Sequence, residues 1–371
     1  MRAPTLYIIC GEASADLHTA NLALALRASS PNIRLLGTGG DRMAEAGVEI
    51  RQHIRDMSFM GFVEVLANLP RILGIMKFLK QDIQSQKPDA VLLVDYPGMN
   101  LKLAPWIREQ GIPVFYYISP QLWAWKKGRV EIVKKYINRM FVVLPFECSF
   151  YEREGVQAEF YGHPLLDEFA KPLPETDELT KVSKPILALL PGSRVQEIRK
   201  ILPVFIRAAK RFPGYEPVIA CAPAINSELY AAIPETKGVL RVVNQTRELL
   251  RHSSLALVAS GTATLEAALA GVPQVVGYKA NPVSVFLARR LVKVKYISLV
   301  NLILDKPVLK ELIQEELNEE SLVKALSEIA GQTEGAQKMK ADYEELLQVL
   351  GGPGCSVRIA EQILKAIKCD R

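Results

Sequence analysis

Short apolar runs alternate along this chain with segments whose apolar residues recur at the spacing of an amphipathic helix. Eight of the runs have the length and composition of buried strands: residues 5–10, 90–95, 114–119, 140–145, 186–191, 217–222, 255–260 and 273–278. A strand that is apolar throughout is typical of a parallel sheet with both faces covered by helices. The alternation therefore predicts an α/β fold built from repeated βα units.

Two interruptions of this pattern indicate how the chain is organised. Residues 169–185 are rich in proline and charge and have no apolar period, as expected for an interdomain linker. Beyond Gln314 only helical patterns follow, and the glycine-rich stretch 351–354 separates them from a last amphipathic helix. That helix has one apolar side, formed by Ile359, Ile363, Leu364 and Ile367.

The length of the chain bears on the number of domains. Because 371 residues exceed one typical core, we expect two doubly wound, Rossmann-like domains that face each other across a cleft. The predicted boundaries are residues 1–170 for an N-terminal domain, 171–185 for the linker, 186–350 for a C-terminal domain, and 351–371 for a terminal helix that packs across the domains or onto a partner chain.

The composition indicates a globular protein and excludes several classes. The net charge of +6 favours an anionic partner without distinguishing a nucleotide, a nucleic acid or a membrane surface. The five cysteines lack CxxC spacing, so neither a zinc site nor a disulfide framework is indicated. The apolar run 6–10 is too short for a signal peptide, and no charge-free run reaches the ~18 residues of a spanning helix. We therefore expect a protein of the reducing cytoplasm that does not span a membrane.

Residues 255–279 have the features of a ligand-binding unit. A buried strand leads into the small-residue turn Ser260, Gly261 and Thr262, and a helix follows that places Glu266 one turn beyond Thr262 on the same face. Free backbone N–H groups and the positive end of the helix dipole would face an anion there. A nucleotide diphosphate with a ribose hydroxyl on the Glu266 carboxylate fits this pattern, and so does an ordinary strand–helix junction with a solvated Glu266.

Further candidates lie where open α/β sheets bind ligands, beyond the carboxyl ends of strands. Glu12 follows the first strand, either as a functional carboxylate or as one that compensates a helix dipole. Asp95 ends the strand 90–95, where an apolar approach would raise its pKa toward that of a general base; a turn-forming aspartate is the alternative. In the segment 189–194, Arg194 could bind phosphate oxygens through its guanidinium, or pair with Glu197 on the surface.

Other chemistries lack their sequence patterns. The chain has no P-loop lysine, no GxGxxG fingerprint, no GxSxG elbow and no metal-ligand set, which disfavours kinase, dehydrogenase, hydrolase and zinc-enzyme functions. His163 is better explained as a packing or turn residue than as a catalytic base. We expect no metal and no cofactor.

Two stretches suggest contact with acyl chains or a membrane surface. Residues 59–80 are more apolar than one core-facing stripe requires, and residues 286–296 place cations among apolar side chains, a pattern suited to headgroup phosphates. A core helix with a solvated basic face is the alternative for each. The residues proposed for acyl or membrane contact are Phe62, Val63, Leu66, Leu69, Arg289, Arg290, Lys293 and Lys295.

Ten motifs, taken together, resemble those of bacterial lipid-A-disaccharide synthase in order and spacing, over nearly the whole chain. They are GEASADLH, FMGFVEVL, VDYPGMN, SPQLWAWKKGRV, LPFE, GHPLLD, LLPGSR, SGTATLEAALAGVPQVVGYK, LARRLVK and YISLVNLI. The resemblance implies a GT-B glycosyltransferase, a hexosyltransferase that joins UDP-2,3-diacylglucosamine to 2,3-diacylglucosamine 1-phosphate with inversion and releases UDP. It also implies a Gram-negative source, a place at the inner face of the inner membrane, and no nucleic-acid partner; the C-terminal helices would allow a homodimer.

The resemblance also implies roles for the candidate residues. Asp95 would deprotonate the acceptor 6-hydroxyl, and Glu12 would orient a sugar. On the donor side, Glu266 would bind the ribose, and Asn301 would lie at the rim of the cleft. The diphosphate would be bound by Arg194, Ser260, Gly261 and Thr262, and Ser193 would be a further substrate-binding residue.

The sequence departs from the family pattern at a few positions, and two other functions fit parts of it. Ala15 stands where the family usually has glycine, Val300 where proline is common, and residues 308–312 replace a VPEL-like segment. A related GT-B enzyme acting on another UDP-sugar, such as a UDP-N-acetylglucosamine 2-epimerase, would share the nucleotide site. A non-enzymatic peripheral lipid-binding protein would share the apolar and basic stretches.

Overall fold

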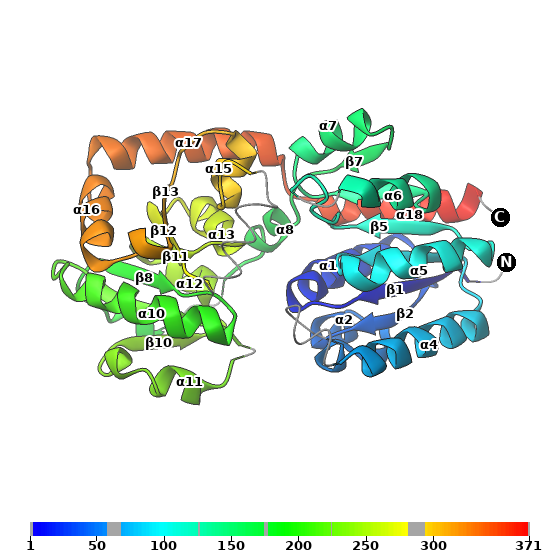
Figure 1. Cartoon of the computed structure of the whole chain (residues 1–371), viewed down its shortest axis with the longest axis horizontal. Coiled ribbons are helices and arrows are strands. Elements are labelled where there is room, and N and C mark those ends of the chain that lie inside the picture. Colours follow the sequence, from blue (N-terminus) through cyan, green and yellow to red (C-terminus); the bar gives the residue numbers. More distant parts are fainter. Residues whose placement is uncertain are drawn as a thin grey trace. The chain divides into compact units, whose positions relative to one another are not determined.

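A computed structural model describes residues 3–57, 68–124, 127–173, 177–223, 225–280 and 294–369 (Figure 1). The chain divides into two compact units, one formed by Met1–Ala170 together with Leu350–Arg371 and the other by Lys171–Val349. Both units are built on a parallel sheet, as the alternating pattern predicts. None of the helices in the described ranges combines the length and apolar character needed to cross a bilayer.

The sheet of the first unit has seven strands in the order β3-β2-β1-β4-β5-β6-β7. Its strands are β1 (Thr5–Cys10), β2 (Arg34–Gly39), β3 (Glu49–His53), β4 (Ala90–Val94), β5 (Val114–Tyr117), β6 (Arg139–Val142) and β7 (Ala158–Phe160). Its helices are α1 (Ala13–Ser29), α2 (Asp41–Glu45), α4 (Leu69–Gln86), α5 (Pro97–Glu109), α6 (Val130–Tyr136), α7 (Phe146–Arg153), α8 (Leu165–Phe169) and α18 (Cys355–Cys369), with short 3-10 turns at Ile54–Asp56 and Lys127–Arg129.

The central strand β1 explains why these strands are apolar throughout. Leu6 and Ile8 pack into a core with α1 and α18, whereas Tyr7 and Ile9 pack into a second core on the other face, with α4 and α5. Side chains alternate between the faces of a strand, so a strand covered on both sides has no solvent-facing position. Burying each large apolar side chain stabilises the fold by roughly 1.5 to 3 kcal/mol.

The C-terminal helix α18 belongs to the first unit. Its predicted apolar side, including Ile359, Ile363 and Ile367, is buried in the same core as Leu6 and Ile8. Asp167 caps the start of α18 by accepting the backbone N–H groups of Gly354, Cys355 and Ser356, at 2.6, 3.1 and 2.8 Å. The carboxylate therefore satisfies N–H groups that no carbonyl within the helix can reach.

The sheet of the second unit has six strands in the order β10-β9-β8-β11-β12-β13. Its strands are β8 (Ile186–Leu190), β9 (Glu216–Cys221), β10 (Leu240–Val243), β11 (Ser253–Ala259), β12 (Gln274–Tyr278) and β13 (Lys310–Ile313). Its helices are α9 (Asp177–Thr180), α10 (Val195–Lys210), α11 (Ser227–Ala231), α12 (Thr246–Arg251), α13 (Ala263–Leu269), α15 (Leu299–Leu304), α16 (Glu319–Ile329) and α17 (Glu334–Leu350), with 3-10 turns at Pro234–Thr236 and Gln314–Glu316.

Candidate active site

Asp95 follows β4 directly and has an unusual backbone conformation. Both Asp95 and Tyr96 lie in the left-handed region, with φ values of 45° and 46°, which residues other than glycine rarely adopt. Asn100 Nδ2 and the Tyr116 hydroxyl donate to the Asp95 carbonyl oxygen at 2.8 and 2.5 Å, and the Asp95 N–H donates to the Tyr117 carbonyl at 3.0 Å. Three neighbours thus fix the backbone from which the carboxylate extends.

The surroundings of Asp95 favour its neutral form. Burial, and then the negative charge of Glu12, raise the pKa of the Asp95 carboxyl to about 7; a hydrogen bond with the Tyr96 backbone opposes this rise, and Glu147 adds to it. A carboxyl group with this pKa is half ionised near neutral pH. It can therefore accept a proton from a substrate and release it again, as a general base must.

Glu12 lies beside Asp95 because β1 and β4 are neighbouring parallel strands. It precedes α1 in an extended conformation, and its charge adds to burial in raising the pKa of both Asp95 and Tyr96. Gly11 permits this close arrangement, since a Cβ atom there would lie 2.5 Å from the Tyr96 ring. The structure thus brings together the two carboxylates that the sequence predicts at separate strand ends.

The first loop also contains a structural carboxylate. Asp16 accepts the backbone N–H groups of Gly40, Arg42 and Met43 at 2.6, 3.2 and 3.3 Å, at the start of α2. Ala15 is buried inside α1. Asp16 therefore connects α1 to α2.

Glu147, within the LPFE motif, is a residue that the sequence did not single out. It lies in the first turn of α7, the helix that follows β6, and its side chain is buried. Burial raises the pKa of its carboxyl to about 7, although hydrogen bonds from Ser119, Leu144, Trp123 and Val143 oppose the rise. Its position near the carboxyl end of a strand was the available indication, since the same rule selected Asp95.

Histidine 163 is buried and plays the packing role expected of it. Its Nδ1 accepts the Leu165 backbone N–H at 3.2 Å. Burial, together with the nearby His18, lowers its pKa to about 3, so the imidazole is neutral at physiological pH.

In the second unit, the segment after β8 carries Ser193 and Arg194, which are both exposed. Arg194 precedes α10, and its Nη1 donates to Glu197 Oε1 at 2.8 Å, which is the surface pairing considered as an alternative. The Arg194 side chain is 59% exposed, so the pair contributes little to stability. The guanidinium can therefore exchange this partner for an anionic ligand at low cost.

The turn after β11 lies next to this segment, because β8 and β11 are paired strands. Gly261 and Thr262 are exposed, whereas the Ser260 hydroxyl donates to the Ile297 carbonyl at 2.8 Å. Glu266 on α13 is partly buried; burial raises the pKa of its carboxyl, and Arg247 on α12 opposes the rise. The environment of Glu266 is thus more enclosed than that of a surface carboxylate.

Asn301 is buried, and its amide connects α15 to β13. Its Oδ1 accepts the Leu309 N–H at 2.8 Å, and its Nδ2 donates to the Leu309 carbonyl and to Glu311 Oε1, each at 2.9 Å. Glu311 also accepts the Ile297 and Ser298 backbone N–H groups, at 3.0 and 2.9 Å. Since Ile297 accepts the Ser260 hydroxyl, Asn301 supports the turn after β11 through Glu311.

Most of the predicted acyl and membrane contacts lie outside the described residues: Phe62, Val63, Leu66, Arg289, Arg290 and Lys293. Leu69, at the start of α4, is 44% exposed, and Leu73 one turn later is 57% exposed. Lys295 is exposed and pairs with Asp305 at 3.0 Å. The described start of α4 therefore presents apolar side chains to solvent.

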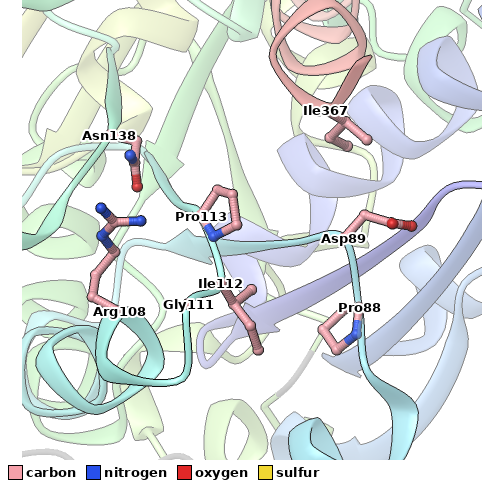
Figure 2. A pocket seen from close by; sticks show the side chains of 8 residues that line it. All are labelled: Pro88, Asp89, Arg108, Gly111, Ile112, Pro113, Asn138 and Ile367. Atoms are coloured by element: carbon pink, nitrogen blue, oxygen red, sulfur yellow. The ribbon is translucent and has the colours of Figure 1, made fainter. Parts of the chain in front are cut away.

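A pocket of about 400 Å³ lies elsewhere in the first unit (Figure 2). Its lining residues precede β4, β5 and β6 or lie on α5 and α18: Pro88, Asp89, Arg108, Gly111, Ile112, Pro113, Asn138 and Ile367. These residues lie at the amino ends of the strands, whereas Asp95 lies at the carboxyl end of β4, so the pocket is at the opposite end of the sheet from Asp95.

In the part of the chain that the structure describes, no cluster of three or more histidine, cysteine or carboxylate side chains could hold a metal ion.

Comparisons with known proteins extend over the whole chain. The family model for lipid-A-disaccharide synthetase matches residues 6–367. The lipid-A-disaccharide synthase of Myxococcus xanthus (strain DK1622) is 39% identical, with 99% of each chain covered. That of Anaeromyxobacter dehalogenans (strain 2CP-C) is 38% identical, with 98% of this chain and 97% of the relative covered.

Among solved structures, a putative UDP-N-acetylglucosamine 2-epimerase from Listeria monocytogenes superposes with a TM-score of 0.69 at 16% identity, with 99% of this chain and 96% of that chain covered. At this identity the likeness bears on the fold alone. Together with the two parallel sheets, it confirms the predicted GT-B architecture of two Rossmann-like domains with C-terminal helices.

Proposed function

Because the chain belongs to the lipid-A-disaccharide synthase family, we propose that it joins two acylated glucosamines in lipid A biosynthesis. The donor is UDP-2,3-diacylglucosamine and the acceptor is 2,3-diacylglucosamine 1-phosphate. The acceptor 6-hydroxyl attacks the anomeric carbon of the donor, the bond from that carbon to the diphosphate breaks, and UDP leaves. Attack opposite the leaving group inverts the anomeric configuration.

Asp95 carries this proposal, since it has the position and the pKa of a general base. Its left-handed backbone is held by Asn100 and Tyr116 at the carboxyl end of β4, where open α/β sheets bind ligands. In the proposed step, the Asp95 carboxylate accepts the proton of the 6-hydroxyl as the new glycosidic bond forms. Glu12, directly beside it, orients the bound sugar and keeps Asp95 basic through its charge.

The donor is assigned to the second unit. The diphosphate is bound by Ser193 and Arg194 before α10 and by residues 260–262 before α13, on neighbouring strands. Glu266 binds a ribose hydroxyl, and Asn301 acts on this site indirectly, through Glu311 and Ile297. Backbone N–H groups and the arginine stabilise the charge of the departing UDP, so the proposed chemistry uses no metal and no cofactor.

We assign the enzyme to the inner face of the inner membrane as a peripheral protein. Both substrates carry acyl chains, and the apolar side chains at the start of α4 continue the sequence that contains Phe62, Val63 and Leu66. The cations Arg289, Arg290, Lys293 and Lys295 suit anionic headgroups. A homodimer through the C-terminal helices is part of this proposal.

The decisive test mixes the purified protein with both diacylated sugars and follows UDP and the disaccharide phosphate. We expect both products in equal amounts, and none when either sugar is omitted. Epimerisation of UDP-N-acetylglucosamine without an acceptor would instead assign a soluble UDP-sugar enzyme. Vesicle binding without any UDP release would assign a lipid-binding protein.

A further inference from the structure

The Glu147 carboxylate is surrounded by hydrogen-bond donors. Its Oε1 accepts from the Ser119 hydroxyl at 2.5 Å and from the Trp123 indole N–H at 3.1 Å. Its Oε2 accepts the backbone N–H groups of Val143 and Leu144, at 3.3 and 3.0 Å. An ionised carboxylate accepts at both oxygens and donates at neither, so it matches four donors in a way that a glutamine could not.

These hydrogen bonds connect Glu147 to the loop 119–124, which follows β5. The same part of β5 contacts the base, since the Asp95 N–H donates to the Tyr117 carbonyl at 3.0 Å and the Tyr116 hydroxyl donates to the Asp95 carbonyl. Ile118 takes a left-handed φ of 60° as the chain leaves the sheet. The loop that Glu147 anchors therefore follows, after Ile118, the strand residues that hold Asp95.

We propose that Glu147 is a positioning residue for proton transfer by Asp95: it anchors the loop 119–124 that follows β5, the strand whose Tyr116 and Tyr117 hold the Asp95 backbone, and it adds a second negative charge, besides that of Glu12, to this end of the sheet. The inference rests on the proposed role of Asp95. It assigns a function to a buried carboxyl group whose ionisation is disfavoured by burial.

The charged groups that face Asp95 determine whether neutralising Glu147 raises or lowers the pKa of Asp95. Glu12 from the start of α1 and Glu147 from α7 repel the ionised form of Asp95. Cys10 on β1 and Tyr116 on β5 are neutral near pH 7, because burial raises the pKa of each; the cation Arg129 acts on Tyr116. Neutralising Glu147 should therefore lower the pKa of Asp95 and move the acid limb of the kcat–pH profile to lower pH.

The test compares kcat–pH profiles at saturating substrates. For Glu147→Gln we expect the acid limb to shift to lower pH, because the variant lacks the charge that repels ionised Asp95. Glu147→Asp retains the charge and should keep the limb near its original pH, although the shorter side chain lowers kcat. Glu168→Gln is the matched control, because Glu168 is another buried carboxylate of the same unit, bonded to Asn21 at 2.5 Å, and it should leave the limb in place.

An unmoved limb in folded Glu147→Gln would overturn the proposal and leave Glu147 as a structural anchor. If that variant does not fold, Ser119→Ala serves instead. It removes one donor to the ionised carboxylate, makes Glu147 less ionised, and should move the limb the same way; an unmoved limb there has the same consequence. Asp95→Asn separates the base role of Asp95 from the positioning role of Glu147. If the kcat–pH profile of its residual activity keeps the same acid limb, the base assignment is refuted, whatever Glu147 does.

Discussion

Replacing Asp95 with asparagine should abolish most activity while stabilising the protein at neutral pH. Asparagine has nearly the same shape, and the contacts from Asn100, Tyr116 and Tyr117 go to the backbone, so the fold should persist. A general base contributes a factor of roughly 10² to 10⁴, and kcat should fall by about that much. UDP binding should be unchanged.

The stability gain follows from the raised pKa of Asp95. The folded state holds its proton up to about pH 7, whereas the unfolded chain releases it near the ordinary value of 3.8. Stability from this group is complete below pH 3.8 and is lost as the pH rises to 7, by about 1.4 kcal/mol per pH unit. The total, from the difference between 7 and 3.8, is at most about 4 kcal/mol.

Denaturant unfolding of both proteins between pH 4 and 8 measures this difference. The variant should gain on the wild type through pH 7 and then keep a constant advantage. A difference that does not depend on pH would mean that Asp95 is ionised throughout, and near-normal turnover in the variant would make it a turn residue. The first result would refute the raised pKa of Asp95, and the second would refute the base assignment.

Three further predictions concern other parts of the chain. Arg194→Ala should reduce the rise in melting temperature caused by UDP, since a ligand stabilises the state it binds, whereas Lys210→Ala at the far end of α10 should not; equal shifts would place Arg194 away from the phosphates. Asn301→Ala leaves buried polar groups of Leu309 and Glu311 without their hydrogen-bond partner, and it should lower the free energy of unfolding of the second unit by roughly 2 to 4 kcal/mol, measured with denaturant. A smaller change would mean that the remaining hydrogen bonds of Glu311 rearrange to compensate. Glutamine at Arg289, Arg290, Lys293 and Lys295 should weaken binding to anionic vesicles at low salt and spare UDP affinity; salt-insensitive binding in both proteins would remove the electrostatic part of the membrane proposal.

The strands that the sequence predicts and those that it misses differ in their place in the sheets. All eight predicted runs form strands, and these occupy the interior of the two sheets. Of the missed strands, β3, β7, β10 and β13 are edge strands, with polar sequences such as EIRQH and KELI. An edge strand is partly open to solvent, so the apolar pattern that identifies a central strand is absent. The interior β2 was missed because glycines interrupt its short apolar run.

The candidate active-site residues likewise divide into those that follow an apolar strand in the sequence and those whose partners are brought together only by the fold. Glu12 and Asp95 could be predicted because each directly follows an apolar strand, and pairing of β1 with β4 brings them together. Glu147 lies several residues beyond β6, and only the folded loop shows that Ser119 and Trp123 converge on it. Asn301 was expected at a rim, but its long-range hydrogen bonds to Leu309 and Glu311 have no counterpart in a sequence pattern.

The return of α18 to the first unit has a consequence for the order in which the nascent chain can fold. The core that contains Leu6 and Ile8 is completed by Ile359 and Ile363, so it stays open until the last helix has been translated. The intervening residues Lys171–Val349 take roughly 10 to 40 s to synthesise at 5–20 residues per second. During that interval the second unit can fold, while the apolar side of α1 stays uncovered because α18 has not yet been synthesised. A chain truncated before α18 would leave this apolar side of α1 permanently exposed.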